Sequence, residues 1–522
     1  MLTKDTRTAV ADRTVADQDK QTLHELGYAQ ELLRGMKTFQ NFAISFSIIC
    51  ILSGGINSFS QGLGSLGGAA IGIGWPVGAL GSLMFAVAMA QIGSAYPTAG
   101  GLYHWASILG GRGLGWITAW FNLIGLVTVL AAINVGTYLF LIGALAPYLG
   151  IDTGPLTSAA PTLYSTLVQA VVVGLITVSQ GLFNHFGIKL TTKMTDLSGY
   201  LIFAGSLALT ICVLAFAPHL EVSRLWTFSN FSGDAGGSVW PHSDSIPYLF
   251  ILCLLLPAYT ITGFDASAHT AEETVDARRA LPRGMIHAVL WSGLFGWLML
   301  SAVIVAAPDL KGAAAQGGNG FFAIMGAVVP EPFLFVIWVI VAVAQYACGL
   351  ATVTSASRMI FAFSRDGGLP VSDVLRRVSP KYRTPVPAIW TAVLLSVIFT
   401  VYTPVYTTIA AVSVIFLYVS YALPLAAGFL AYQRSWTRMG PFDIGAAFRP
   451  LAALCIAVCA VLIYSGMQPP NDKALTATLG VLAAAAVIWL VFERRRFKGP
   501  PIILGIRSEA VLIAAVRAVG EA

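Results

Sequence analysis

Two short polar interruptions in long apolar stretches hold the residues whose types and spacing could bind a charged solute. A helix broken at such a point exposes backbone N–H groups where one half begins and C=O groups where the other half ends, with partial positive and negative charge. A zwitterion would fit such a pair, with its carboxylate on the first break and its amine on the second. The candidate binding residues are Ser53, Gly54, Gly55, Ile56 and Asn57 in the first apolar run and Thr262, Gly263, Phe264 and Asp265 in the sixth.

Asp265 is the most informative of these residues, because it places a carboxylate inside an apolar run. A charged side chain at the centre of a bilayer costs about 2.5 to 3.5 kcal/mol on insertion scales and is functional by default. Asp265 could add full negative charge beside a bound amine, or it could itself take up a proton. The structural alternative for Asp265 is a cap on the second half-helix, and for the glycines it is close helix packing.

Other chemistries find little support. The segment 62–67 matches G-x-G-x-x-G but follows an apolar run with no strand before it, and no P-loop sequence occurs, so ATP is not an expected partner. The six cysteines all lie in apolar runs without metal-ligand spacing, so neither a metal nor a cofactor is predicted. His104 and His269 could relay protons. Without paired carboxylates or a Ser-His arrangement, an enzyme is not expected.

The elements that must position these residues are membrane helices. Of 522 residues, 57% are hydrophobic and 10% charged, which excludes a soluble protein. A spanning helix needs roughly 20 apolar residues, and the net charge of +6 lies at the ends of apolar runs instead of on a nucleic-acid-binding face. Twelve spans are predicted, at 42–62, 69–95, 114–146, 163–183, 197–217, 247–269, 286–307, 333–363, 386–402, 407–431, 451–466 and 474–492.

Alternate connections differ in charge, which predicts the orientation. Of the 30 Lys and Arg residues, only Arg224, Lys311 and Lys473 fall on one side of the membrane. Basic residues favour the cytoplasmic side, so both termini are expected in the cytoplasm, and the chain is expected in the cytoplasmic membrane. The two breaks lie five spans apart, which predicts inverted repeats. The expected units are a tail at 1–41, a five-helix repeat at 42–217, an external loop at 218–246, an inverted repeat at 247–432, two further helices within 451–492 and a tail at 493–522.

Several short motifs resemble the amino acid-polyamine-organocation superfamily, and within it the amino acid/choline transporter branch with its GABA-permease-like members. The resemblance covers roughly residues 25–495. It implies an all-α fold of five plus five inverted helices with two extra ones, discontinuous helices 1 and 6, and alternating access to a site between helices 1, 3, 6, 8 and 10. The motifs are Leu26-Gly27-Tyr28, Gln30-Glu31-Leu32, 41–49, 96–103, Gly263-Phe264-Asp265-Ala266 with Glu272-Glu273, Arg358, 365–370 and Thr384-Pro385-Val386-Pro387.

The resemblance also implies roles for individual residues. Phe264 would be an aromatic gate over the substrate, and Asn122 on helix 3 a polar contact to it. The cytoplasmic gate would be formed by Glu272, Glu273, Arg358 and Arg365, for which the alternative is a solvated cluster that sets topology.

The coupling ion stays open between H⁺ and Na⁺. Some members of the superfamily carry a lysine in helix 5 in place of a sodium ion, whereas this chain has Ile202 near that point. Thr352, Thr354 and Ser355 could supply oxygens to sodium, or could simply bond to carbonyls one turn earlier.

These features predict a secondary active transporter that imports a small amine-bearing solute, GABA or another amino acid first among the candidates. The alternatives are a choline or polyamine transporter of the same fold, and a nutrient sensor that does not transport. Its expected partners are the solute and the lipid bilayer, without nucleic acid.

Overall fold

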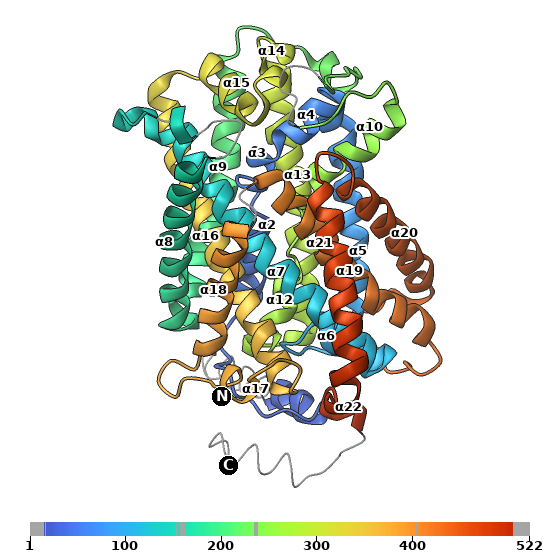
Figure 1. The fold of residues 1–522 in the computed structure, drawn as a ribbon. Coiled ribbons are helices and arrows are strands. Elements are labelled where there is room, and N and C mark those ends of the chain that lie inside the picture. The colour runs from blue at the N-terminus through green and yellow to red at the C-terminus, as the bar shows by residue number, and fades with distance from the viewer. Residues whose placement is uncertain are drawn as a thin grey trace, which may run out of the picture.

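The computed structural model describes residues 15, 17–152, 154–156, 162–233, 239–402 and 405–504. It is an elongated bundle of helices (Figure 1). One end, here called the α15 end, carries α14 (Leu310–Ala315) and α15 (Gly320–Val328). The opposite end, the α17 end, carries α17 (Ser372–Leu375) and α22 (Arg494–Arg496). The predicted tail at 493–522 falls mostly outside the described residues.

The long helices alternate between the two ends and account for the twelve predicted spans, so the expected all-α fold is confirmed. Within the described residues, ten helical segments are long and apolar enough to cross a membrane. The remaining two spans are α10 with α11, and α18, which are shorter apolar helices. The bounds are α2 (Thr38–Ile49), α5 (Trp75–Ala95), α7 (Arg112–Phe140), α8 (Leu163–His185), α9 (Ile188–Phe216), α10 (Ile246–Cys253), α11 (Leu255–Thr260), α13 (Ala277–Ala306), α16 (Glu331–Arg365), α18 (Val386–Tyr402), α19 (Tyr406–Ala431), α20 (Phe448–Gly466) and α21 (Asp472–Ile488).

Spans 1 and 6 are discontinuous, as the sequence predicted. The first consists of α2, α3 (Gly54–Asn57) and α4 (Phe59–Leu66), and the sixth of α10, α11 and the short α12 (Ala266–His269). The first break lies earlier than expected: residues 50–53 are unwound, whereas Gly54–Asn57 form a helical turn. The second break covers residues 261–265.

Gly263 makes the second break feasible. Its φ of +85° lies in the left-handed region, which only glycine enters without a steric penalty. A Cβ at this position would also collide with the side chain of Ile48 on α2. The backbone of span 6 therefore turns at Gly263 and touches span 1 at the same place.

Burial separates a central group of helices from a peripheral one. In span 1, 89% of the most hydrophobic stretch is buried, compared with 11% in the last span. Helix α7 packs along α16 and α19, and α13 packs along α2 and α5. Helices α8, α20 and α21 lie at the outside of the bundle, where their apolar side chains face the lipid (Figure 1). The two breaks thus lie in the best buried part of the protein.

Candidate functional site

The two discontinuous spans contact each other next to their breaks. A Cβ placed on Gly54 would lie only 2.8 Å from Cα of Thr260, so this glycine permits the close approach of α3 to α11. Gly55 has ordinary contacts with Leu300 and Met299 of α13. The first glycine is therefore required by packing, and both unwound stretches lie at one level of the bundle.

The N–H groups expected to bind a carboxylate are largely used within span 1. Ser53 and Gly54 donate to the carbonyl of Cys50, Gly55 donates to Ile51, and Asn57 donates to Ser53. In the part of the chain that the structure describes, the N–H groups of Ile51 and Leu52 have no acceptor. Two of the free donors thus precede the glycines, and the N–H of Ile56 is a third one without an acceptor among the described residues.

The second break presents carbonyls and one tethered N–H. Gly263 donates its N–H to the hydroxyl of Tyr421 on α19 (3.1 Å), which also lies 3.3 Å from Oγ1 of Thr262. The carbonyl of Phe264 accepts from Ser45 on α2 (2.8 Å). Among the described residues, no donor reaches the carbonyls of Thr260 and Thr262. These two carbonyls are available to an amine.

Asp265 lies at the centre of a buried polar cluster and is itself fully buried. Its Oδ1 accepts from the Tyr421 hydroxyl (2.8 Å), and its Oδ2 accepts from Nδ2 of Asn122 on α7 (3.1 Å). Nε2 of His269, one helical turn further on, lies 3.2 Å from the same Oδ2. The other ring nitrogen of His269 lies 3.1 Å from the carbonyl of Ala99. The structure therefore joins Asn122, expected as a contact to the substrate, to Asp265 itself, together with Tyr421 and His269.

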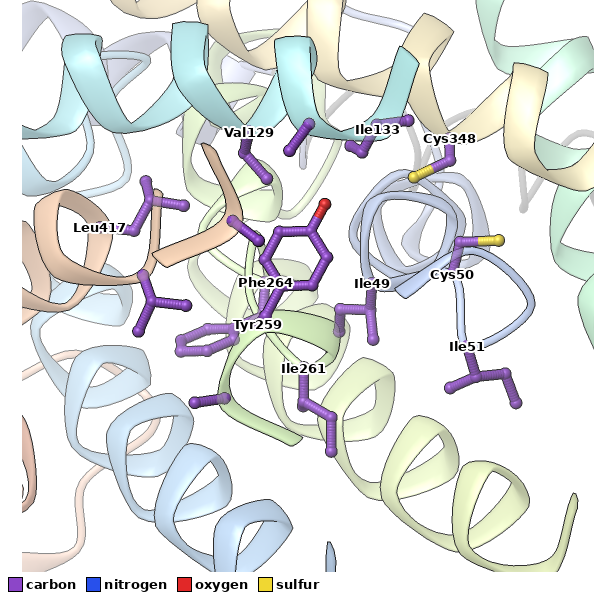
Figure 2. Packing of buried hydrophobic residues seen from close by; sticks show 14 of the residues in the cluster. Ile49, Cys50, Ile51, Val129, Ile133, Tyr259, Ile261, Phe264, Cys348 and Leu417 are labelled. Carbon is purple, nitrogen blue, oxygen red and sulfur yellow. The ribbon is translucent and has the colours of Figure 1, made fainter. Parts of the chain in front are cut away.

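Apolar side chains surround the breaks on the remaining sides. Figure 2 shows Ile49 and Cys50 of span 1, Tyr259 and Phe264 of span 6, and Val129 and Ile133 of α7 around the same space. Phe264 is fully buried, with its ring centroid 5.0 Å from that of Tyr421. An aromatic gate in this position would cover Asp265.

Neutral hydrogen bonds close the site towards the α15 end. Asn57 donates to Gln345 on α16 (3.4 Å), and Gln345 donates to the carbonyl of Leu52 in the unwound stretch (3.0 Å). The hydroxyl of Ser58 lies 3.0 Å from that of Tyr406 on α19. These contacts join span 1 to α16 and α19 without using a charge.

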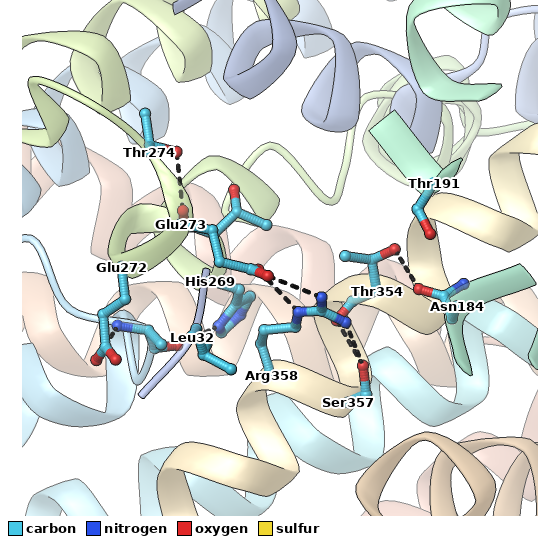
Figure 3. Close-up of polar contacts among 12 residues, drawn as sticks. Leu32, Asn184, Thr191, His269, Glu272, Glu273, Thr274, Thr354, Ser357 and Arg358 are labelled. Atoms are coloured by element: carbon cyan, nitrogen blue, oxygen red, sulfur yellow. Dashed lines mark hydrogen bonds and ion pairs between the residues drawn. The ribbon is translucent and has the colours of Figure 1, made fainter. Parts of the chain in front are cut away.

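Two ion pairs close the site towards the α17 end, and Figure 3 shows the one between Arg358 and Glu273. The guanidinium of Arg358 donates to both oxygens of Glu273 (2.9 and 3.0 Å), and Arg365 donates to both oxygens of Glu272 (2.7 and 3.0 Å). Both carboxylates are fully buried. The four residues are therefore two bidentate pairs, not a solvated cluster.

Glu272 is also tied to the connection between α5 and α6 (Leu102–Gly110), because Ala99 donates its N–H to Oε1 of Glu272 (3.0 Å). Burial by itself would raise the pKa of Glu272, but the Arg365 guanidinium, the Ala99 N–H and the nearby His104 together more than offset it and lower the pKa below its ordinary value of 4.5. Glu272 therefore stays ionised at neutral pH.

A further cluster at the α17 end was not predicted from the sequence. Oδ2 of Asp366 accepts from the hydroxyls of Tyr28 and Tyr103 (both 2.8 Å) and lies 3.1 Å from Nε2 of His104. Arg365 lies over the Tyr28 ring at 3.9 Å. Burial, with the nearby Asp366 carboxylate, raises the pKa of Tyr28. The motifs around Tyr28 and Asp366 were visible, but their mutual contact depends on tertiary structure.

The hydroxyls proposed for sodium have protein partners. Thr352 donates to the carbonyl of Cys348 one turn earlier (2.9 Å), and Thr354 donates to Oδ1 of Asn184 (2.7 Å; Figure 3). Ser355 is buried, and its hydroxyl has no partner among the described residues. Ile202, at the place of the lysine in helix 5, is buried in the core. These contacts favour the structural interpretation for Thr352 and Thr354.

Twelve membrane helices with paired breaks in spans 1 and 6 define a multi-pass membrane permease. The chain belongs to the amino acid permease family, whose model matches residues 36–492, so the superfamily resemblance is confirmed. It is 31% identical to the amino-acid permease BAT1 of Arabidopsis thaliana, over 93% of this chain and 97% of that protein. A BAT1 homolog of rice (Oryza sativa subsp. japonica) is also 31% identical, over 92% and 94%. The GABA-specific permease of Saccharomyces cerevisiae is 28% identical, over 92% and 86%.

Proposed function

We propose that the protein imports a small zwitterionic amino acid across the cytoplasmic membrane by alternating access, with GABA as the first substrate to test. The observation that supports this most directly is the meeting of the two breaks, with free N–H groups on span 1 and free carbonyls on span 6. A carboxylate at Ile51 and Leu52, close to Ser53, and an amine at the carbonyls of Thr260 and Thr262 would satisfy both sets.

The charges around the site favour a zwitterion over a bare cation such as choline or putrescine. Asp265 faces His269, Glu272 faces Arg365, and Glu273 faces Arg358, so each of these carboxylates already has a partner. A cation without its own carboxylate would find no unpaired negative charge in the site, so nothing would offset the free energy needed to remove its hydration shell. An amino acid brings both charges and adds none to the site.

The orientation of the bundle follows from its basic residues. Arg224 bonds to the carbonyls at the end of α13, and Lys311 lies in α14, which places both at the α15 end. The α17 end carries the ion pairs of Arg358 and Arg365 and most of the other cationic residues. By the positive-inside rule the α17 end would face the cytoplasm. Glu272, Glu273, Arg358 and Arg365 would then form the cytoplasmic gate.

Uptake of labelled GABA by proteoliposomes containing the purified chain tests the function. Unlabelled amino acids, choline and putrescine serve as competitors, under imposed proton or sodium gradients. We expect amino acids to compete and the two cations to leave uptake unchanged. Competition by choline or putrescine alone would replace the amino acid assignment, and no flux of any panel member in a folded sample would favour the sensor.

A further inference from the structure

We propose that Asp265 and His269 together bind the proton that is transported with the substrate. This inference rests on the proposed function and assigns its coupling ion. The two side chains are fully buried, Asp265 directly precedes α12 and His269 ends it four residues later, and Oδ2 of Asp265 is 3.2 Å from Nε2 of His269.

The hydrogen bonds of His269 determine how many protons the pair holds. Nδ1 lies 3.1 Å from the carbonyl oxygen of Ala99, which can only accept, so Nδ1 carries a hydrogen. Nε2 faces a carboxylate oxygen at hydrogen-bond distance. A bond at this position requires one more proton, either on Nε2 as an imidazolium or on Oδ2 as a carboxylic acid. In both forms the pair is neutral and holds one exchangeable proton between the two atoms.

The other partners of Asp265 do not supply that proton. Nδ2 of Asn122 belongs to an amide, which does not ionise in proteins, and it donates to Oδ2. The Tyr421 oxygen accepts the N–H of Gly263, and its own hydrogen is directed to Oδ1 of Asp265 at 2.8 Å. The contact between Oδ2 and Nε2 is therefore the place where a proton is gained or lost.

Loss of the proton would destabilise the closed arrangement seen here. An ionised Asp265 and a neutral His269 with hydrogen on Nδ1 would direct two lone pairs at each other in a buried site, where an unmade hydrogen bond is costly. His269 could restore the bond only by moving its hydrogen to Nε2, which would leave Nδ1 facing the Ala99 carbonyl without a hydrogen. Either response loosens the contact between α12 and the connection that holds Ala99.

That connection reaches the ion pairs of the α17 end. Ala99 accepts from His269 through its carbonyl and donates to Glu272 through its N–H, and Glu272 is paired with Arg365. A proton on the pair thus favours closure towards the α17 end, and its release favours opening. The proton would enter with the substrate from the opposite side and leave when this end opens.

The other polar and charged side chains around the pair are neutral or already in ion pairs. Helix α16 contributes Arg358 and Arg365, and the segment after α12 contributes Glu272 and Glu273, all four already in bidentate ion pairs. Helix α19 contributes the Tyr421 hydroxyl, α7 contributes the neutral Asn122, and α2 contributes Asn41 and Ser45, which are neutral. On α13, Arg283 and His287 are exposed and face away.

The substitution Asp265→Asn provides the sharpest test, because the amide N–H can donate to Nε2 of a neutral His269 as a carboxylic acid would. The variant would imitate the proton-loaded state permanently. Wild-type protein in proteoliposomes with a trapped pH dye should acidify the lumen when labelled GABA, or the panel amino acid that exchanges fastest, enters. Asp265→Asn should abolish the acidification of the lumen and all accumulation driven by a proton gradient. Its residual exchange of labelled for unlabelled substrate should be independent of pH over roughly pH 5 to 8.

His104→Gln is the matched control, since His104 is equally buried and lies 3.1 Å from Asp366, but at the α17 end. It should keep the wild-type ratio of protons to substrate even if the rate changes. His269→Gln should lose the proton signal, and serves if Asp265→Asn does not fold.

Three results would overturn the proposal. The first is net uptake by the wild-type protein without proton entry, for example with sodium as the driving ion. The second is proton-driven accumulation by Asp265→Asn or His269→Gln, and the third is loss of coupling in His104→Gln alone. Absence of any wild-type exchange would instead refute the transport function itself, and this inference with it.

Discussion

The Arg358→Met variant should hold the α17 end open. Arg358 and Glu273 form a bidentate pair in which the side chains are 1% and 0% exposed, so removing the guanidinium leaves a buried carboxylate without its partner. Breaking such a pair costs about 3 to 5 kcal/mol. An open end would let water reach Glu273, so the cost falls on the closed state. At 1.4 kcal/mol per tenfold change, the ratio of open to closed molecules should rise by a factor on the order of 10² to 10³.

The thiol of Cys348 gives a direct assay for this opening. Cys348 and Cys50 are free, buried and next to the breaks, as Figure 2 shows. Alkylation of Cys348 by a polar maleimide, followed by peptide mass spectrometry, should accelerate in Arg358→Met in proportion to the open population. The control is Arg376→Met, because Arg376 and Asp373 form an exposed pair, 52% and 86% accessible, whose loss should have little effect.

A double variant separates opening from general damage. Arg358→Met with Glu273→Met replaces a buried ion pair by apolar groups, which is often close to neutral for stability. It should restore the melting temperature but not the transport cycle. Alkylation of Cys348 at the wild-type rate in a folded Arg358→Met protein would refute the assignment of this pair to the closure.

Three further substitutions test the site, each by thermal unfolding in detergent. Gly263→Ala should lower the stability by about 1 to 2 kcal/mol because of the left-handed φ at this position, and its Cβ would also clash with Ile48. The control is Gly326→Ala, which has open space around it and should be neutral or stabilising. Equal melting temperatures of the two variants would show that Gly263 is not required. Tyr421→Phe removes a hydrogen-bond partner from Asp265 and from the Gly263 N–H, so it should lower the stability by about 1 to 3 kcal/mol and weaken the competition of unlabelled substrate for uptake. The control Tyr418→Phe, which loses its contact with Ser82, should leave this competition unchanged. An equal loss of competition in both variants would contradict a special role for Tyr421. Glu272→Gln should lower the melting temperature at pH 7. The difference in melting temperature from the wild type should shrink as the pH falls below 4.5 through the lowered pKa of Glu272, because this carboxylate stabilises the fold only while it is ionised. A difference that is the same at all pH values would refute a role for the ionised carboxylate.

The fold could be predicted largely from the lengths of the apolar runs, since spans of about 20 residues recur along the chain. The exact position of the first break could not be predicted in this way. Glycine is tolerated inside membrane helices, and the residues that unwind are fixed by distant partners such as Gln345, which binds the carbonyl of Leu52. The sequence placed the first break at Gly54 and Gly55, whereas in the structure Gly54 permits a close approach to α11 and both glycines belong to a helical turn.

The site shows the same division between local and distant information. His269 follows Asp265 by four residues, so their contact was predictable from helix periodicity alone. The partners Asn122 and Tyr421 come from two other helices, and only the folded chain shows that Tyr421 reaches Asp265. Likewise the sequence supplied two adjacent glutamates and two arginines seven residues apart, but not which glutamate pairs with which arginine.

The pairing of each carboxylate around the breaks has an electrical consequence. A net elementary charge moved through the membrane field gains or loses about 2.3 kcal/mol per 100 mV. Glu272 with Arg365 and Glu273 with Arg358 each sum to zero, and Asp265 with His269 does so while its proton is bound, so the rearrangement of the proton-loaded region displaces little charge of its own. Voltage-clamp recordings should therefore show small transient currents without substrate, and the steady current should report only the charge that the transported species bring with them.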